Sequence, residues 1–300
     1  MKSIRSIFLF LTCTAPAAAA DLNVFACEPE WAALLAELAG PRVAVTSATT
    51  AAQDVHTIQA RPSLIAAARR ADLVVCSGAS LEIGWLPLLL RQSTNNRVMP
   101  GQPGYFETAL EVPRLEVPSV VDRAAGDIHP FGNPHVQLDP RNITPIATAL
   151  SRRLIQLDPS GAADYRARLD DFRQRWNQAL AGWEARAVPL AGLRLVVHHN
   201  SWVYLAAWLH LDIVGYLEPK PGLPPTSGHL AELLATLKDQ PPAAIVRSAY
   251  QSERPSAWLA ERTGSTAIEL PHTVDGKEIK DLFTLFDEIL RRLSTVAGTP

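Results

Sequence analysis

The sequence predicts an α/β protein of two lobes, each built on a mainly parallel sheet, joined by one long rigid helix. Three observations support this fold class. Short apolar runs alternate with stretches in which apolar residues recur at helical spacing, which is typical of βαβ units. A long amphipathic stretch, residues 160–187, interrupts this alternation near the middle of the chain. The chain also has 300 residues, which is more than one hydrophobic core normally serves.

The amino terminus has the features of a cleavable secretion signal. Lys2 and Arg5 precede the apolar run Ile7–Leu11, and Ala18–Ala20 offer a small-residue cleavage site. The run is too short to cross a bilayer, so we expect the segment to be removed and the mature chain to be a soluble protein of the periplasm. The alternative is a lipoprotein attached at Cys13, but the residues before this cysteine are not the small ones that usually precede such a site.

The charge balance argues against a nucleic-acid partner. The 28 basic and 30 acidic residues give a net charge of -2, and removal of the signal takes away two cations and no acid. A mildly acidic chain without a basic stripe lacks the electrostatic surface that nucleic acid requires.

The first lobe shows the alternation of strands and helices most clearly. Its predicted strands are Leu22–Cys27, Val43–Thr46 and Ala71–Cys76. Apolar residues at helical spacing follow the first strand, and Pro62 can open the helix before the third. Residues 99–134 are rich in Pro and Gly, so we expect loops and short extended pieces, and no long regular element, there.

The middle of the chain predicts one long helix. Aromatic and aliphatic residues recur every three or four positions between Ser160 and Ala187. Such a helix reaches about 40 Å, which suits a brace between two lobes better than a crossover within one. Strands then resume at Leu193–His198, Asp212–Leu217, Ala243–Val246 and Thr266–Leu270. The resulting segments are the signal (1–20), the first lobe (21–158), the linking helix (159–188) and the second lobe (189–300).

Two cysteines remain after removal of the signal. Cys27 and Cys76 each end a predicted strand, so they can be neighbours in a parallel sheet. An oxidising compartment permits a disulfide between them, and two buried free thiols are the alternative. A thiolate metal site needs more cysteine than this.

Four histidines follow predicted strands or lie in loops: His56, His135, His199 and His272. Loops at the carboxyl ends of parallel strands converge on one crevice, so histidines far apart in sequence can meet around one metal ion. Taken singly, each has an ordinary explanation, such as an exposed loop for His56 or a helix-entry turn for His135. His198 would point to the opposite face from His199 in an extended strand, so at most one of the two is a ligand of the same ion.

Taken together, four motifs resemble a known family. They are Asp-x-His-Thr (54–57), Leu-Val-Val-x-x-Gly-x-x-Leu-Glu (73–82), Asn-Pro-His-x-x-Leu-Asp-Pro (133–140) and Val-Val-x-His-x-x-x-x-Tyr (196–204). Their order resembles that of the metal-binding solute receptors of bacterial ABC importers for zinc and manganese, the cluster A-I family, over nearly the whole mature chain. The resemblance implies two α/β lobes, one rigid connecting helix, and an ion held in the cleft by two ligands from each lobe.

The resemblance also implies which residues bind the ion. His56 and His135 take the places of the first-lobe ligands, and His199 that of the first second-lobe ligand. Imidazole suits zinc, whereas manganese sites take more carboxylate. In the manganese branch a glutamate commonly stands where this chain has His199, so the resemblance favours zinc. Asp139 and Glu218 are candidates to orient a ligand imidazole through its second nitrogen.

The fourth ligand of a tetrahedral zinc is the point where the chain departs from the family. Many relatives have an Asp in a Leu-Asp-Pro-Leu-Gly-Gly turn, whereas this chain reads Leu-Pro-His-Thr-Val-Asp-Gly (270–276). A gap-free alignment places His272 there, a small shift of the loop places Asp275 there, and a water molecule is the third option. His129 lies where zinc receptors often have a histidine-rich loop, and is either an accessory zinc-gathering residue or an ordinary loop histidine.

We therefore expect a receptor and no enzyme: it captures Zn²⁺ and delivers it to an ABC permease in the inner membrane, with a metallochaperone as a further partner to consider. The alternative from another class is a secreted zinc-dependent hydrolase, but the chain has no His-Glu-x-x-His motif and no evident general base. A receptor for manganese, another divalent metal or an organic solute would use the same fold.

Overall fold

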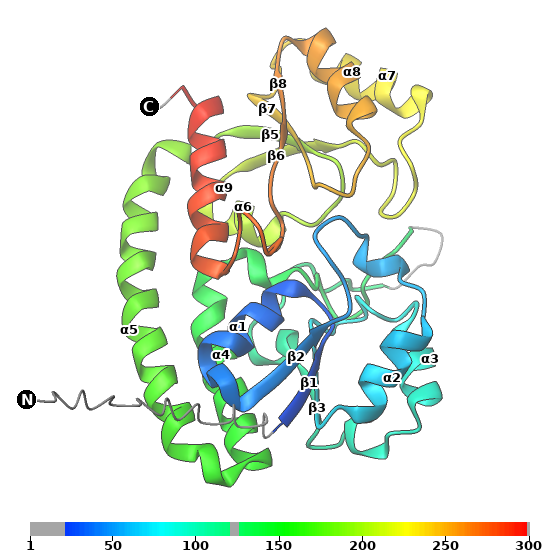
Figure 1. Ribbon diagram of the computed structural model, residues 1–300. Coiled ribbons are helices and arrows are strands. Elements are labelled where there is room, and N and C mark those ends of the chain that lie inside the picture. Colours follow the sequence, from blue (N-terminus) through cyan, green and yellow to red (C-terminus); the bar gives the residue numbers. More distant parts are fainter. Residues whose placement is uncertain (1–21, 121–125, 299–300) are drawn as a thin grey trace, which may run out of the picture.

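The computed structural model describes residues 22–120 and 126–298, so the predicted signal lies outside the described residues. Two four-stranded sheets form the two lobes, and every strand pair in them is parallel (Figure 1). The first sheet has the order β2-β1-β3-β4 and the second the order β6-β5-β7-β8. The strands are β1 (Leu22–Ala26), β2 (Val43–Ser47), β3 (Leu73–Cys76), β4 (Tyr105–Glu107), β5 (Arg194–Val197), β6 (Asp212–Tyr216), β7 (Ala244–Arg247) and β8 (Thr266–Glu269).

Helices cover both sheets. The first lobe has α1 (Pro29–Ala39), α2 (Pro62–Arg70), α3 (Leu86–Ser93) and α4 (Pro140–Leu157), and the second has α6 (Val203–Leu209), α7 (Ser227–Thr236), α8 (Glu253–Thr263) and α9 (Leu282–Val296). The spacing that predicts the first of them has a clear physical basis, because Trp31, Leu34 and Leu38 are fully buried on one face of α1.

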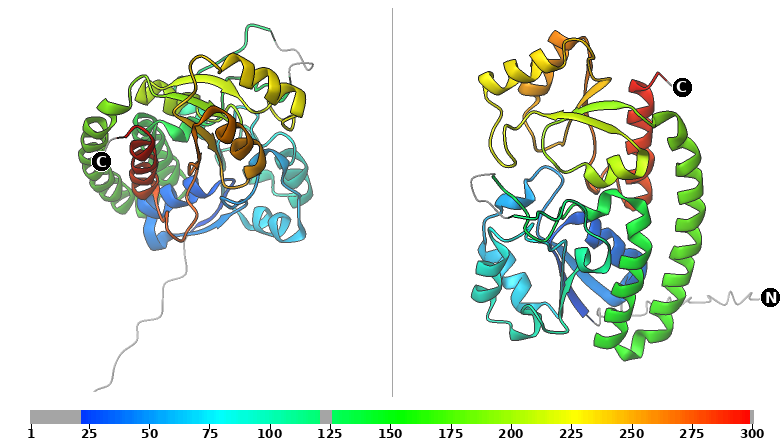
Figure 2. Two further views of the ribbon diagram at one scale, coloured as in Figure 1. Left: turned by 90° about the horizontal axis from the view of Figure 1, so that it is seen from above. Right: turned by 180° about the vertical axis from the view of Figure 1, so that it is seen from behind.

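One long helix joins the lobes, as the sequence predicts. Helix α5 (Ala162–Ala187) has 26 residues and runs along both lobes (Figures 1 and 2). A short 3-10 turn, Pro159–Gly161, precedes it, and the Asp158 carboxylate accepts the Gly161 N–H. Among the described residues, no helix is long and apolar enough to cross a membrane.

The two lobes share one apolar core. Its buried members include Val24 of the first sheet, Val197 of the second, Trp176 of α5 and Phe286 of α9. The rings of Trp176 and Phe286 lie 5.8 Å apart, and the Trp176 indole N–H donates to the carbonyl of Pro140 at 2.9 Å. Separation of the lobes would expose this apolar surface to water, so the shared core opposes it.

The strands agree with the sequence prediction. Strand β4 has only three residues and lies in the Pro- and Gly-rich segment 99–134, where we expected loops and short extended pieces. Its residues pair with β3 alone, at the edge of the sheet. A strand this short has too few residues to show an alternating pattern.

Cys27 and Cys76 form a disulfide. They stand at or just after the carboxyl ends of the adjacent strands β1 and β3, as the parallel sheet requires. The question between a disulfide and two free thiols is therefore resolved in favour of the disulfide, which joins residues 49 positions apart in the sequence.

Candidate metal centre

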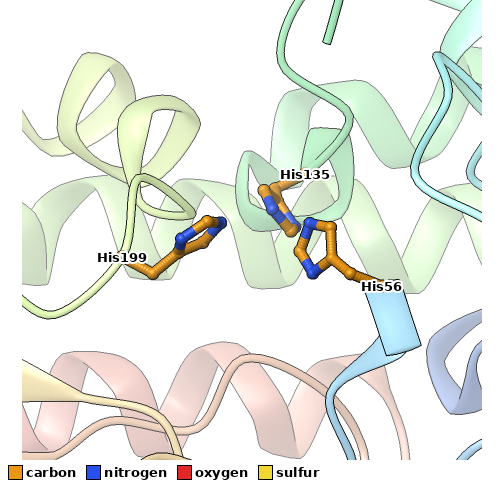
Figure 3. A group of neighbouring side chains, drawn as sticks. All are labelled: His56, His135 and His199. Atoms are coloured by element: carbon orange, nitrogen blue, oxygen red, sulfur yellow. The ribbon is translucent and has the colours of Figure 1, made fainter. Parts of the chain in front are cut away.

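Three histidines from distant parts of the chain meet between the lobes. His56, His135 and His199 each offer a ring nitrogen, and these three atoms lie within 4.8 Å of one another. Their ring centroids are 5.2 Å (His56 to His199), 5.8 Å (His56 to His135) and 6.1 Å (His135 to His199) apart. Figure 3 shows the three rings turned toward a common point.

His56 is fixed by the turn that carries it. It lies in a 3-10 turn, Val55–Thr57, whose N-cap is Asp54. The Asp54 carboxylate accepts the backbone N–H of His56 at 3.0 Å and lies 2.8 Å from its Nδ1. Because Nδ1 is engaged with the carboxylate, Nε2 is directed away from it, and this buried nitrogen has no hydrogen-bond partner.

His135 is a buried ligand candidate of the first lobe. The side-chain oxygen of Asn133 accepts its backbone N–H at 3.1 Å, which fixes the turn around Pro134. Its Nε2 is buried and has no hydrogen-bond partner. Burial, together with the neighbouring histidines, holds the pKa of His135 well below the usual value, so the ring stays neutral and able to bind a metal.

His199 comes from the second lobe, two residues after β5 ends. Its Nδ1 lies 2.7 Å from the carboxylate of Glu218, which follows β6. The sequence analysis named Glu218 as a candidate for this role. His198 is not part of the three-histidine group, in agreement with the expectation that only one of the pair faces the ion.

His129 approaches the same point from the mouth of the cleft. Its ring lies 5.5 Å from His56 and 6.4 Å from His135, and its buried Nε2 has no partner. Burial lowers the pKa of His129 to about 3, with a further contribution from the other histidines. The ring is therefore neutral at physiological pH.

The two candidates for the fourth ligand do not join the group. His272 follows β8, and its ring packs 5.3 Å from that of Tyr250; it is not among the side chains whose donor atoms lie within 4.8 Å of one another. Asp275 is exposed, and its carboxylate accepts the backbone N–H groups of Lys277 and Ile279. The carboxylate thus stabilises its own turn, and in this structure Asp275 lies outside the three-histidine group.

Asp139, the other candidate for orienting an imidazole, has a different partner. Its carboxylate caps α4 by accepting the Arg141 backbone N–H at 2.9 Å and pairs with the Arg141 guanidinium at 2.6 Å. Because the carboxylate is paired with Arg141, the expectation that Asp139 orients a ligand imidazole is wrong. Asp54 holds the imidazole of His56 instead; it stands two residues before His56, but its role was not predicted from the sequence.

Hydrogen bonds between the lobes surround the group. The Tyr204 hydroxyl donates to the Asn133 carbonyl at 2.8 Å and accepts the Leu115 N–H at 3.0 Å. On the opposite side, the Thr273 hydroxyl donates to the carboxylate of Glu30, a buried residue of α1. These contacts hold the second-lobe ligand in register with the first-lobe pair.

The chemistry of the group suits a divalent metal ion. The donors are imidazole nitrogens, and carboxylates hold the second nitrogen of two of the rings, which is the usual surrounding of metal-binding histidines. The free Nε2 atoms of His56 and His135 are buried, and an unpaired buried polar atom costs about 1–3 kcal/mol. A bound cation would remove this cost.

Fold and site together define a two-lobed metal-binding receptor, and comparison with known proteins identifies its family. The chain matches the ZnuA family, zinc-uptake complex component A, periplasmic, over residues 24–296, and belongs to it. Proteins of this family are the substrate-binding receptors of ABC importers and are not enzymes, in agreement with the expectation from sequence.

Solved structures share the fold over almost the whole chain. A crystal structure of ZnuA is similar with a TM-score of 0.76 and 21% identity, covering 93% of this chain and 98% of that one. A Mn-bound periplasmic metal-binding protein from Candidatus Liberibacter asiaticus gives a TM-score of 0.73 at 17% identity, covering 92% and 99%.

Two curated relatives are named for different metals. The manganese-binding lipoprotein MntA of Halalkalibacterium halodurans is 24% identical over 209 residues, which cover 69% of this chain and 64% of that protein. The iron-binding protein YfeA of Yersinia pestis is 23% identical over 237 residues, covering 76% and 70%. The family thus establishes a metal receptor, and the choice of metal depends on the residues of this site.

Proposed function

We propose that the protein captures Zn²⁺ in the periplasm and delivers it to the membrane permease of an ABC importer. The observation that carries the proposal is the donor set: His56, His135 and His199 supply three imidazole nitrogens and no carboxylate oxygen. Nitrogen donors favour zinc over manganese, which takes more oxygen ligands. The manganese and iron named for the relatives make these ions the principal competitors.

We propose His129 as the fourth donor. It is neutral, its Nε2 is unpaired, and its ring is 5.5 Å from that of His56. A small movement of the segment that carries it would complete a tetrahedral site. His272, the alternative from the sequence, would need its loop to move away from Tyr250, against which it packs.

The mouth of the cleft favours entry of a cation. A hollow of about 90 Å³ leads to His129 and His199, and Glu116 and Asp127 line it. Such acidic groups raise the local concentration of cations. The lobes touch here: the Asp127 backbone N–H donates to the Pro221 carbonyl at 2.9 Å.

The close approach of residue 222 to the Asp127 side chain at the mouth requires a glycine. A Cβ atom at Gly222 would lie 2.3 Å from an Asp127 carboxylate oxygen, and its φ of +79° also favours glycine. The segments 126–129 and 219–222 therefore form a strap across the mouth, and its loosening would let the ion pass.

A disulfide and a signal sequence support the location. The predicted signal would export the chain, and the Cys27–Cys76 bond is stable in an oxidising compartment. Delivery to a permease follows from membership of the family.

A chelator-competition titration tests the proposal. The metal-stripped protein is titrated with Zn²⁺, Mn²⁺ and Fe²⁺, beside His56→Ala, His199→Ala, His129→Ala and His272→Ala. His210→Asn is the matched control, because His210 is exposed and its left-handed backbone tolerates asparagine.

We expect one tight zinc site. His56→Ala and His199→Ala should weaken it at least 100-fold, His129→Ala about 10-fold, and His272→Ala and the control less than twofold. Equal or tighter binding of Mn²⁺ would contradict the choice of zinc. A site that is insensitive to His56 and His199 would contradict the location.

A further inference from the structure

The surface of the first lobe carries an apolar groove outside the metal centre. It has a volume of about 340 Å³, and its walls include Ile83, Leu110 and Phe131. These side chains are 68%, 61% and 58% exposed, which is unusual for residues of their size. Glu107 also lines it, with Tyr105 beside it. We call this feature the first-lobe groove.

Exposed apolar side chains are concentrated in the part of the chain that builds the groove, and three of them line it. Of the eight large hydrophobic residues that are exposed in the described part of the chain, six lie between residues 83 and 131. They are Ile83, Leu88, Leu110, Val117, Val120 and Phe131. Grouped apolar exposure of this kind marks a surface that binds another protein, whereas scattered single residues need no explanation.

The groove is connected to the metal centre through one backbone segment. Gly78, Ala79 and Ser80 all have positive φ, of +77°, +50° and +71°, which is strained for the alanine and the serine. Ala79 and Ser80 line the groove, and the backbone of Ala79 also hydrogen-bonds to the ring of His129. Phe131, which also lines the groove, follows His129 by two residues. A protein seated in the groove would thus contact both segments that hold His129.

Charged groups of both signs line the groove: the carboxylate of Glu107 and the guanidinium of Arg114. The Tyr105 hydroxyl donates to the Glu107 carboxylate at 3.0 Å. Burial raises the pKa of Tyr105, and the negative charges of Glu107 and Glu82 raise it further. A basic side chain that enters beside an apolar one would find a complementary charge at Glu107.

We propose that the first-lobe groove is a docking site for the importer's permease, and that it receives an external segment in which an aliphatic or aromatic side chain stands next to Lys or Arg. This inference rests on the proposed function and adds the surface and the chemistry of the partner. The permease is the occupant because the groove adjoins the strap at the mouth, where the ion has to leave. Binding of the permease there would displace the segments around His129 for as long as the receptor is docked.

Zinc uptake by whole cells tests the docking site. The cells depend on this protein and its own permease for zinc, and they express the natural chain, the double variant Ile83→Ser/Phe131→Ser, or Glu107→Gln. The rate of ⁶⁵Zn²⁺ uptake is measured for each. Val188→Ser is the matched control, because Val188 is equally exposed, at 73%, but lies at the far end of α5. The zinc affinity of each purified variant is measured in parallel.

We expect the double variant to reduce uptake at least 10-fold and Glu107→Gln about threefold, while zinc affinity and uptake by the control change less than twofold. Full uptake by the double variant would overturn the docking site and leave the proposed function intact. Failure of the natural chain to bind zinc would overturn both.

A photo-reactive amino acid at position 131 identifies the occupant. We expect it to crosslink to the permease, whereas the same group at position 188 does not. A crosslink to a soluble metallochaperone or to a second copy of the chain, with none to the permease, would overturn the proposal.

Discussion

The Glu218 carboxylate offers the sharpest test of how the site is built. It lies 2.7 Å from Nδ1 of His199 and also accepts the Gly222 backbone N–H at 2.9 Å. Glu218→Gln keeps the shape of the side chain and removes its charge. The His199 and Glu218 side chains are only 7% and 13% exposed, so solvent screens their interaction weakly.

The expected loss follows from this geometry. A hydrogen bond to a charged group contributes about 1.5–3 kcal/mol, and loss of the partner of a metal-binding histidine typically weakens metal binding about 10- to 100-fold. The two estimates agree, because 10- to 100-fold corresponds to about 1.4–2.7 kcal/mol. We therefore expect the zinc Kd of Glu218→Gln to rise within this range.

Chelator competition at constant pH measures the change. Glu269→Gln is the control, since Glu269 is also a carboxylate of the second lobe but pairs with Arg247 at 2.7 Å. A Kd for Glu218→Gln within twofold of the natural chain, with the control also unchanged, would refute the view that the carboxylate orients His199.

Three further predictions concern stability and pH. Replacement of both Cys27 and Cys76 by alanine should lower the free energy of unfolding by about 4 kcal/mol, because the disulfide joins residues 49 positions apart and so restricts the unfolded chain. Guanidinium denaturation measures the change, and an unchanged denaturation midpoint would contradict the prediction. The pKa of His129 is about 3 and that of His135 lies well below its usual value, so neither ring takes up a proton between pH 7 and pH 5.5. His129→Ala should therefore lose the same fraction of its zinc affinity over this range as the natural chain does; chelator competition at the two pH values measures this, and a smaller loss in the variant would contradict the neutral state of His129. Burial raises the pKa of Glu82 to about 7, so the folded chain keeps a proton that the unfolded chain loses near pH 4.5, and this group lowers stability as the pH rises through that window. The effect of Glu82→Gln on the free energy of unfolding should therefore be more stabilising at pH 8 than at pH 4, by about 1–3 kcal/mol. An equal effect at the two pH values would contradict this prediction.

The sequence was sufficient for the fold because the apolar runs that form the strands are local patterns. For the central histidines it was sufficient for two different reasons. His199 follows β5, so the parallel sheet carries it to the crevice between the lobes. His56 and His135 lie in loops, and the order of the four motifs that resemble the metal receptors indicated their place; all three histidines meet at one point.

The remaining assignments depend on contacts that no local pattern contains. Asp139 lies close to His135 in the sequence, but its carboxylate forms an ion pair with Arg141 and does not contact an imidazole. The loop after β8 is positioned by the other lobe, through Thr273 on Glu30 and the His272 carbonyl, which accepts the Gln137 amide at 3.4 Å. Which residue of that loop approaches the ion is therefore decided by tertiary contacts, and alignment alone could not give it.

The apolar core that the lobes share has a kinetic consequence. With Val24, Val197 and Trp176 in one buried cluster, a wide opening of the molecule is costly. If the strap closes the mouth as proposed, exchange of the ion requires this strap to open, and its opening rate then limits both arrival and escape. An ion bound by a free receptor should have a long residence time, and a partner that moves the strap can shorten it without unfolding any part of the core.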